Sequence, residues 1–546
     1  LLACNAVDGL RSSFGRGSTE RTTMQILLAY TAATSSGNRD VGAFETLLPI
    51  GLCSLHGLLR SRNLPATLAN LSGSSDAEIT RLLHRISPTL VGLSQWTHNR
   101  HETIRAARLI KRTLPDCLVI LGGGHATHQA ELILQCHPEV DLIVLGEGEQ
   151  TLLELLSALE DSRELTTVPG LAMRSQGGVI RTAPRSAWTD LDQLPFPATY
   201  LHEALQTDVR LQAEFISSSR GCPAACSFCA SPAFWGRTLR FRSATSVVAE
   251  MRFIQEQFGL TYLSLRDDTF TADRRRTVAL CRELIEQQLR LFWNCQSRVE
   301  AIDAETLHWM RLAGCECIQL GVESGSPTML QLLGKHIKPE QVIRAAELIH
   351  QAGLHLSVFL ITGISEERDD DRQQTVNLIK QIRPDDLQVA PLAYYPGTAL
   401  FESGLRAGRY PADIFETAHD EAVLACPDGQ TQVDRLLKRL VRFRHRLQPS
   451  HLQALQQENG FSPVTAMQLG DWHLAAGDPP RAEAQYRAIT IKQPDHPWGW
   501  QLLGELCEQQ GRRREAANCY QKLLQLVPRH SAAREALQRL GHKKGG

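Results

Sequence analysis

The 546-residue sequence has no long hydrophobic run and no excess of charge of either sign. No apolar stretch reaches the roughly 18 residues that a membrane-spanning helix requires, and the first 23 residues lack the apolar centre of a signal peptide. A formal net charge of -1 argues against a broad nucleic-acid-binding surface and against a surface for anionic membranes. These absences predict a cytoplasmic protein with no membrane span and no nucleic-acid partner.

The 14 cysteines are not accompanied by an export signal, which predicts reduced thiols and a bound metal group instead of a disulfide framework. A hydrophobic content of 42% and a charged content of 21% are ordinary for globular protein, and the length requires several domains. Met24 begins an apolar run and looks like a more natural start, so we expect residues 1–23 to be an unstructured extension.

A fourth cysteine is missing where three cysteines stand close together. Cys222, Cys226 and Cys229 are spaced by four and three residues on a loop stiffened by glycine and proline, and the next cysteine is Cys281. Three thiolates leave a tetrahedral metal or a four-iron cluster one ligand short, and that position is open to a substrate. The alternatives are a zinc site that borrows a distant ligand, or three unrelated buried thiols. We call residues 221–230 the cysteine loop.

From Met24 onwards, short apolar runs alternate with helical stretches. Strands are predicted near 25–30, 67–70, 89–95, 118–121 and 141–145. This alternation predicts a doubly wound parallel sheet with a ligand beyond the carboxyl ends of its strands. The helical pattern stops near residue 165, where 170–181 read as a β-hairpin and 191–197 as a proline-stiffened linker.

Two of the predicted strands run directly into glycine-rich loops. The first glycine loop is Gly122, Gly123, Gly124, His125, Ala126 and Thr127, and the second glycine loop is Gly146, Glu147, Gly148 and Glu149. Glycine lets the backbone adopt positive φ angles and approach a bulky ligand closely, although glycine after a strand also makes ordinary tight turns.

A second α/β unit follows the linker, and its first strand, near 215–218, leads into the cysteine loop. Further strand–helix units continue to Gly363, with polar residues gathered at the strand ends, as in a (β/α) barrel with its active site on that face. Near the C-terminus, Leu469-Gly470 and Tyr486 recur 34 residues later as Leu503-Gly504 and Tyr520. This period is the tetratricopeptide signature. A partner-binding role and a purely stabilising role both remain open.

The three-cysteine spacing, with Phe228 just before the last cysteine, resembles the radical S-adenosylmethionine (SAM) enzymes. The resemblance implies that Cys222, Cys226 and Cys229 hold a 4Fe–4S cluster whose fourth iron binds SAM, which is then cleaved reductively. It also implies a partial barrel of six strand–helix units. The residues it places near SAM are Phe228, Asp267, Asp268, Arg298, Glu323, Ser324 and Gly363. The two aspartates could instead start a helix, and Arg298 could form a surface ion pair.

The two glycine loops together resemble the cobalamin-binding domain that many radical SAM enzymes carry. The resemblance implies that Gly122–Thr127 and Gly146–Glu149 contact cobalamin. The Asp-x-His-x-x-Gly signature that supplies a histidine to cobalt elsewhere is missing, so we expect no protein histidine on the cobalt. His125 is then expected at the corrin periphery, or as a plain loop residue.

The predicted fold class is α/β: a doubly wound cobalamin-binding domain, a partial (β/α)6 radical SAM barrel and an all-α tetratricopeptide-like C-terminus. The predicted parts are an extension over 1–23, a cobalamin-binding domain over 24–165, a hairpin and linker over 166–212, a barrel over 213–400, a helical extension over 401–458 and two repeats over 459–541.

The resemblance implies a cobalamin-dependent radical SAM enzyme that methylates an unactivated carbon of an unknown substrate. Its cofactors would be a 4Fe–4S cluster, SAM and cobalamin, with an electron donor such as flavodoxin or ferredoxin and a possible protein partner for the repeats. The alternatives are a cobalamin-binding radical SAM cyclase or rearrangement enzyme, a methylthiotransferase, and a repeat scaffold with a degenerate catalytic half. A methylthiotransferase would need a second cluster, for which only Cys53, Cys117 and Cys136 are available.

Overall fold

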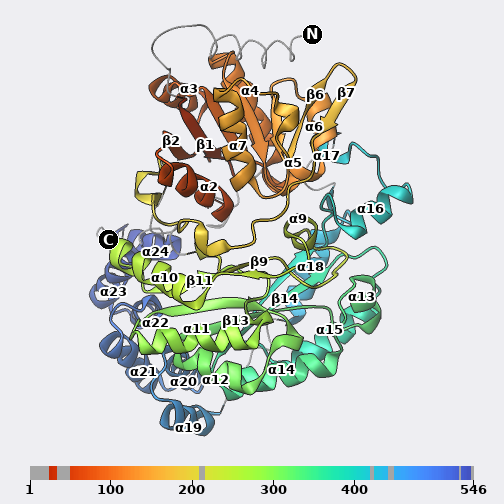
Figure 1. The fold of residues 1–546 in the computed structure, drawn as a ribbon. Helices are drawn as coiled ribbons and strands as arrows, with labels where there is room; N and C mark the ends of the chain where they lie inside the picture. Colours follow the sequence, from red (N-terminus) through yellow and green to blue (C-terminus); the bar gives the residue numbers. More distant parts are fainter. Residues whose placement is uncertain are drawn as a thin grey trace.

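The computed structural model describes residues 24–32, 49–207, 215–417, 423–440, 448–527 and 530–542. The extension predicted over 1–23 lies outside these residues. An N-terminal α/β unit stands above a larger α/β unit, and the C-terminal helices pack along the far side of the larger unit (Figure 1). None of the helices described is long and apolar enough to cross a membrane.

The N-terminal unit (residues 24–207) is built on a seven-stranded sheet with the order β2-β1-β3-β4-β5-β6-β7. The first five strands are parallel, whereas β6 and β7 are antiparallel to their neighbours. The strands are β1 (Ile26–Tyr30), β2 (Ala66–Asn70), β3 (Leu90–Ser94), β4 (Leu118–Gly122), β5 (Leu142–Val144), β6 (Leu171–Ser175) and β7 (Gly178–Arg181).

Helices connect the parallel strands, as the alternating pattern predicted. They are α2 (Ile50–Ser61), α3 (Asp76–Ile86), α4 (Arg100–Thr113), α5 (Gly124–His128), α6 (Ala130–Cys136) and α7 (Gly148–Glu160). The hairpin predicted from 170–181 is present, but it is not part of a linker. It adds two strands to the β5 edge, which supplies partners for backbone groups that an open edge would leave exposed.

The second unit, which we call the barrel (residues 215–391), has six parallel strands in the order β15-β14-β13-β12-β11-β8. They are β8 (Phe215–Ile216), β11 (Tyr262–Leu265), β12 (Phe292–Ser297), β13 (Cys315–Glu323), β14 (His355–Thr362) and β15 (Asp386–Pro391). This is the predicted partial barrel. A short antiparallel pair, β9 (Ser219–Arg220) and β10 (Arg240–Phe241), extends from its first strand.

The helices of the barrel start at side-chain caps that the sequence supplies. Ser243, Asp273 and Asp303 each accept a hydrogen bond from a backbone N–H of the first turn that follows them, at 3.1, 3.0 and 3.0 Å. The helices are α9 (Ser231–Trp235), α10 (Ala244–Phe258), α11 (Arg274–Glu286), α12 (Ala304–Leu312), α13 (Pro327–Leu332), α14 (Pro339–Gln351) and α15 (Asp369–Ile382).

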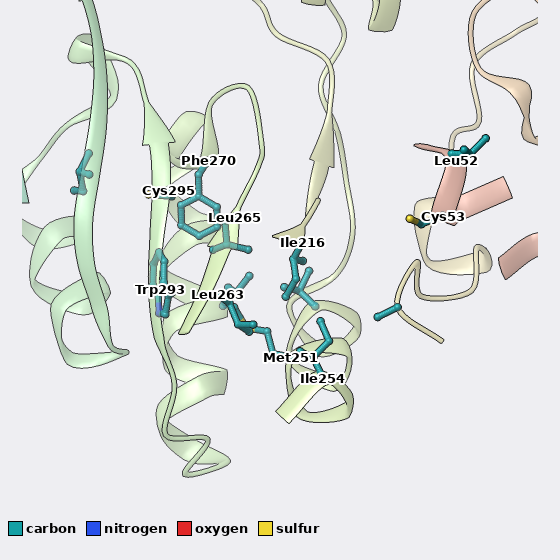
Figure 2. Close-up of a cluster of buried hydrophobic side chains, with 14 of the residues drawn as sticks. Leu52, Cys53, Ile216, Met251, Ile254, Leu263, Leu265, Phe270, Trp293 and Cys295 are labelled. Carbon is teal, nitrogen blue, oxygen red and sulfur yellow. The ribbon is translucent and has the colours of Figure 1, made fainter. Parts of the chain in front are cut away.

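Alternate residues of the barrel strands form its core. Ile216, Leu263 and Leu265 face Met251 and Ile254 of α10, and all five side chains are fully buried (Figure 2). The core continues around Trp293 and Phe270, whose ring centres are 5.3 Å apart. This packing fixes the carboxyl ends of the strands, where the candidate site lies.

The segment after the barrel returns to the N-terminal unit before the C-terminal helices begin. Its helices are α16 (Ala399–Arg406), α17 (Ile414–Thr417), α18 (Gly429–Leu440) and α19 (Pro449–Asn459). In Figure 1, α17 lies beside α5. Arg100 of α4 donates from Nε to the Phe415 carbonyl oxygen at 2.8 Å, and His137 lies 2.6 Å from a carboxylate oxygen of Glu416. These contacts attach the post-barrel segment to the N-terminal unit.

The C-terminal helices repeat one packing arrangement. A Cβ on Gly470 would lie 2.2 Å from the Tyr486 ring, and a Cβ on Gly504 would lie 2.9 Å from the Tyr520 ring. Glycine is thus required where each helix pair crosses, which explains the 34-residue recurrence. The helices are α20 (Pro463–Ala475), α21 (Pro479–Lys492), α22 (Pro497–Gln509), α23 (Arg513–Leu526) and α24 (Ser531–His542).

These helices cover the amino ends of the barrel strands. His496 is fully buried and its Nε2 lies 2.8 Å from a carboxylate oxygen of Glu316, the second residue of β13. Its ring also packs against Phe292, the first residue of β12, with the ring centres 4.8 Å apart. The repeats therefore pack on the barrel itself.

Candidate functional site: the junction of the two α/β units

The cysteine loop is held rigidly at the carboxyl end of β8. Gly221 has a φ of 96°, and a Cβ there would lie 2.3 Å from the Thr238 carbonyl oxygen, so only glycine fits. The Ser227 N–H donates to the Leu333 carbonyl oxygen at 2.9 Å and its hydroxyl donates to the Leu332 carbonyl oxygen at 3.0 Å. Both ends of the three-cysteine run are thus anchored to the barrel.

The three cysteines face different surroundings within this loop. Cys222 is buried, with its Sγ 3.8 Å from the Thr269 hydroxyl, whereas Cys226 and Cys229 are half-buried. Burial raises the pKa of the Cys229 thiol to about 11. The described residues contain no group of three His, Cys, Asp or Glu side chains placed around a single metal ion. Each thiolate of a 4Fe–4S cluster binds a different iron, so thiols spaced for a cluster are not spaced for one zinc ion.

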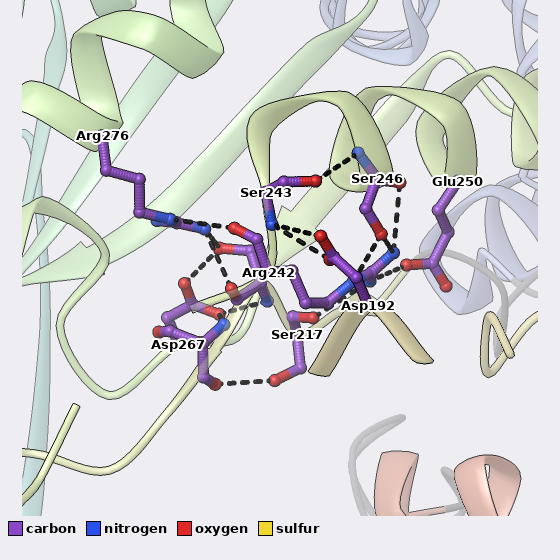
Figure 3. Close-up of polar contacts among 10 residues, drawn as sticks. Asp192, Ser217, Arg242, Ser243, Ser246, Glu250, Asp267 and Arg276 are labelled. Carbon is purple, nitrogen blue, oxygen red and sulfur yellow. Dashed lines mark hydrogen bonds and ion pairs between the residues drawn. The ribbon is translucent and has the colours of Figure 1, made fainter. Parts of the chain in front are cut away.

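Asp267 has a supporting role in the structure (Figure 3). Its carboxylate accepts the N–H groups of Ser218 and Ser219 at 2.6 and 3.1 Å and the hydroxyl of Ser218, and the residue is 1% exposed. Arg276 donates to the same hydroxyl at 2.6 Å. Asp267 therefore shapes the start of the cysteine loop. The alternative that it begins a helix does not hold, because Asp273 is the residue that caps α11, and a SAM contact for Asp267 stays a prediction.

Asp268 and Arg298 lie closer to the open part of the site. Asp268 is half-buried, accepts a hydrogen bond from the Ser231 hydroxyl, and has its pKa raised by burial. Arg298 donates from Nε to Glu300 at 2.6 Å and from Nη1 to the Cys226 Sγ at 3.5 Å. Its guanidinium therefore contacts a predicted cluster ligand directly. A SAM contact for either residue stays a prediction.

Three further predicted SAM contacts lie on neighbouring strands of the barrel. Glu323 ends β13 with a φ of 66° and pairs with Lys335, whose Nζ lies 2.6 Å from its carboxylate. Ser324 is buried, with its hydroxyl 3.2 Å from that of Thr375. Gly363 follows β14, and a Cβ there would lie 3.0 Å from the Gly429 Cα. Strain at Glu323, a non-glycine residue in the left-handed region, is typical of functional positions.

The two glycine loops of the N-terminal unit are joined to each other. The Thr127 hydroxyl accepts a hydrogen bond from the Gly146 N–H at 3.0 Å. Gly123 has a φ of 101°, and a Cβ there would lie 2.6 Å from the Gln95 carbonyl oxygen. A Cβ on Gly124 would lie 2.8 Å from the Trp96 ring. The first glycine loop therefore requires glycine because it packs closely on residues 95–96.

His125 is enclosed by protein. It is 2% exposed, its Nδ1 lies 3.1 Å from the Thr97 hydroxyl, and its ring packs edge-on against Phe415 with the centres 5.2 Å apart. Burial lowers the pKa of His125 to about 3, so the imidazole is neutral. The contact with Phe415 indicates that His125 joins the N-terminal unit to the post-barrel segment. A role at the corrin periphery stays a prediction.

The second glycine loop contacts the cysteine loop through an arginine that the sequence analysis did not single out. Arg220 lies 2.7 Å from Glu147 and 2.6 Å from Glu149, measured between guanidinium nitrogens and carboxylate oxygens. Burial alone would lower the pKa of Arg220, but the two carboxylates hold it above its usual value. The only sequence feature that pointed to this contact is that Arg220 is a charged residue between a predicted strand and Gly221.

A single cavity of about 510 Å3 lies between the two units. The N-terminal unit lines it with both glycine loops, including Gly122, Gly123 and Glu147, and the barrel lines it with Ser219 and Asp268 among others. Most of its lining is apolar, with Trp96, Phe234 and Trp235 among the aromatic residues. Asp268 is the predicted SAM contact that lines this cavity together with the glycine loops, whereas the three cysteines are not among its lining residues.

Three family models match the chain. The radical SAM superfamily model matches residues 216–379, the B12-binding domain model matches residues 43–156, and a tetratricopeptide repeat model matches residues 497–530. An uncharacterized methyltransferase of Pyrococcus horikoshii is 30% identical over 385 residues, which are 69% of this chain and 83% of that protein. The chain therefore belongs to the radical SAM superfamily, among the enzymes that also carry a B12-binding domain.

Other curated relatives differ in the reaction that their names give. The anaerobic magnesium-protoporphyrin IX monomethyl ester cyclase of Rubrivivax gelatinosus is 28% identical, with 69% of this chain and 70% of that protein covered. The hopanoid C-3 methylase of Methylococcus capsulatus is 26% identical, with coverages of 65% and 68%. Among solved structures, the methyltransferase TsrM from Kitasatospora setae has the same fold, and its structure has cobalamin and a 4Fe–4S cluster bound. The TM-score is 0.63 at 16% sequence identity, with 86% of this chain and 100% of that chain covered.

The residues of the site fit the cofactors of this family, which are a 4Fe–4S cluster, SAM and cobalamin. Three cysteines on one anchored loop provide three thiolate ligands and leave one iron open. Gly122 and Gly123 of the first glycine loop line the cavity without side chains, and the cavity reaches from that loop to the barrel. The methylthiotransferase alternative finds no second cysteine set, because Cys53 lies in α2, Cys117 directly precedes β4 and Cys136 ends α6, so these three thiols do not share one loop.

Proposed function

We propose that this enzyme transfers a methyl group to an unactivated carbon of its substrate, using SAM and cobalamin in the cavity between its two units. The observation that carries the proposal is the shared cavity, which both glycine loops and the strand ends of the barrel line. When bound, the cofactors supply the radical that activates the substrate and the methyl group that is transferred.

The chain's own residues position these groups and exclude water. Asp267 and Arg276 hold the start of the cysteine loop through Ser218, so the three thiols keep a fixed place at the carboxyl end of β8. The aromatic residues Trp96, Phe234 and Trp235 give the cavity a dry surface between the glycine loops and Asp268. A dry, rigid site protects a reactive intermediate and removes the cost of reorganising polar groups during the reaction.

The Glu323–Lys335 pair supports the proposed SAM side of the site. Both side chains are almost fully buried, and their closest atoms are 2.6 Å apart. Lys335 neutralises the carboxylate and leaves its second oxygen available to accept a hydrogen bond from a ribose hydroxyl. We propose flavodoxin or ferredoxin as the electron donor and a protein as the partner of the repeats.

The test is product analysis after anaerobic incubation of the reconstituted chain with SAM, cobalamin, reductant and an extract of the host cell. With a deuterated methyl group on SAM, methylation predicts a new product that carries the label. A cyclase, which the Rubrivivax relative favours as the second candidate, predicts a changed product without the label. A labelled product would exclude cyclisation as the main reaction, and an unlabelled product would overturn the proposal.

A further inference from the structure

A buried ion-pair bridge connects the second glycine loop to the strand that precedes the cysteine loop. Arg220 donates from Nη1 to Glu147 at 2.7 Å and from Nη2 to Glu149 at 2.6 Å. The exposed fractions of the three side chains are 11%, 10% and 4%. The two ends of this ion-pair bridge belong to different α/β units, so the bridge crosses the border of the cavity.

A second arginine completes the charge balance of this bridge. Arg240 pairs with Arg220 in the β9–β10 ladder, and its Nη2 lies 2.6 Å from the other oxygen of Glu147. Two guanidinium groups therefore face two carboxylates. The Arg220 guanidinium also lies 5.1 Å from the centre of the Trp235 ring. Buried charges this well paired are stable together, whereas removal of one partner leaves an uncompensated charge.

Both ends of the bridge continue into rigid parts of the site. On the barrel side, only Gly221 separates Arg220 from Cys222, and Gly221 packs so closely on Thr238 that a Cβ there would lie 2.3 Å from the Thr238 carbonyl oxygen. On the other side, Glu149 accepts a hydrogen bond from Ser54 of α2 at 3.0 Å. A displacement of either loop would therefore be passed through Arg220 to the other.

We propose that Arg220 is a positioning residue that sets the separation between the cysteine loop and the second glycine loop, and with it the separation of the two cofactors. The identity of those cofactors rests on the proposed function. Arginine is required because its planar guanidinium has N–H groups on two sides, and each side can donate to a different carboxylate. Lysine would keep the charge but would engage the two carboxylates through one small ammonium group.

The test compares Arg220→Met and Arg220→Lys with the unchanged full chain, each reconstituted with its cluster and with cobalamin. Pulsed electron paramagnetic resonance of the partly reduced protein reports the dipolar coupling between the reduced cluster and cob(II)alamin. We expect one defined coupling in the unchanged chain, a broad distribution in Arg220→Met and an intermediate width in Arg220→Lys. The matched control is Arg185→Met, because Arg185 is 10% exposed and makes two contacts to Glu154 at 3.0 and 2.6 Å without reaching the barrel.

An unchanged coupling in Arg220→Met would overturn the proposal, and so would equal broadening in Arg185→Met. A lowered melting temperature alone would assign Arg220 a stabilising role and would also count against it. If Arg220→Met does not fold, Glu149→Gln removes one carboxylate with little change of shape, and it must broaden the coupling. Failure of the cofactor assignment would look different, because the unchanged chain would then show no cob(II) signal at all. Failure of methyl transfer alone would appear in the product analysis and would leave the coupling unchanged.

Discussion

The first glycine loop offers a sharp test of the cobalamin site through Gly123→Ala. Gly123 has φ 101° and ψ 175°, a region that essentially only glycine occupies, and alanine there costs about 1–3 kcal/mol. The added Cβ would also lie 2.6 Å from the Gln95 carbonyl oxygen. That oxygen cannot move freely, because Gln95 is tied to the loop by hydrogen bonds to Gly122 and His125 at 2.7 and 3.3 Å.

The loop can relieve this overlap only by leaving its native position. A strain of about 1–3 kcal/mol corresponds to roughly 5- to 150-fold weaker cobalamin binding if only the native loop binds. The matched control is Gly146→Ala, since Gly146 has a φ of 68° but a Cβ there would meet nothing within 4 Å. It carries backbone strain without the overlap, and we expect a smaller loss of affinity.

The assay is an absorbance titration of the full chain with hydroxocobalamin, with thermal unfolding of each variant measured separately in the absence of cobalamin. Wild-type affinity in Gly123→Ala would refute the close-packing argument. Equal losses in the two variants would show that backbone strain alone, and not the contact with Gln95, controls the loop.

Four further outcomes follow from the site and its supports. Cys226→Ala should lose the roughly four irons of a reconstituted cluster, and retention of that iron in a metal analysis would disprove the ligand assignment. His125→Gln should not change the nitrogen splitting of the cob(II) paramagnetic resonance signal, because Thr97 and Phe415 enclose the His125 ring. Burial holds the pKa of His125 at about 3 against its usual 6.5, so protonation favours the unfolded chain. As the pH is lowered below about 6.5, the free energy of unfolding should therefore decrease by up to about 1.4 kcal/mol per pH unit. This decrease should be steeper in the wild type than in His125→Gln. His496→Ala should lower the free energy of unfolding by about 3–5 kcal/mol in denaturant titrations, because it leaves the buried Glu316 without its partner. The control Ile491→Ala should change this free energy little, because Ile491 is 76% exposed.

Local patterns predicted the secondary structure well because they depend on neighbouring residues. The run 118–121 became β4 (Leu118–Gly122), since a short unbroken apolar stretch between turns is typical of a strand buried on both faces of a parallel sheet. In the strand–helix units predicted after the cysteine loop, the helix that follows the short α9 is α10 (Ala244–Phe258), with Ser243 as its cap. The membership of a strand in a particular sheet is not local, and the predicted domain over 24–165 therefore left out the hairpin β6–β7, which belongs to its sheet.

The chemistry of individual side chains was predicted less completely. The sequence places Asp267 at a strand end, where a ligand contact and a structural contact are equally plausible. Its real partners, the N–H groups of Ser218 and Ser219, are set by the fold that brings β8 beside β11. Arg220 was missed for the same reason, because its carboxylate partners lie in a different unit of the chain.

The position of the tetratricopeptide helices limits what a partner bound there could do. They pack on Tyr262, Phe292 and His355, which are the first residues of β11, β12 and β14, through rings that include His496 and Trp498. The cavity lies at the opposite, carboxyl ends of the strands, where Asp268 follows β11. A partner on the outer face of the repeats would thus be separated from the cavity by the depth of the barrel. This arrangement favours tethering of the whole enzyme over direct delivery of substrate, and it gives the repeats a structural task as the cover of the barrel's amino end.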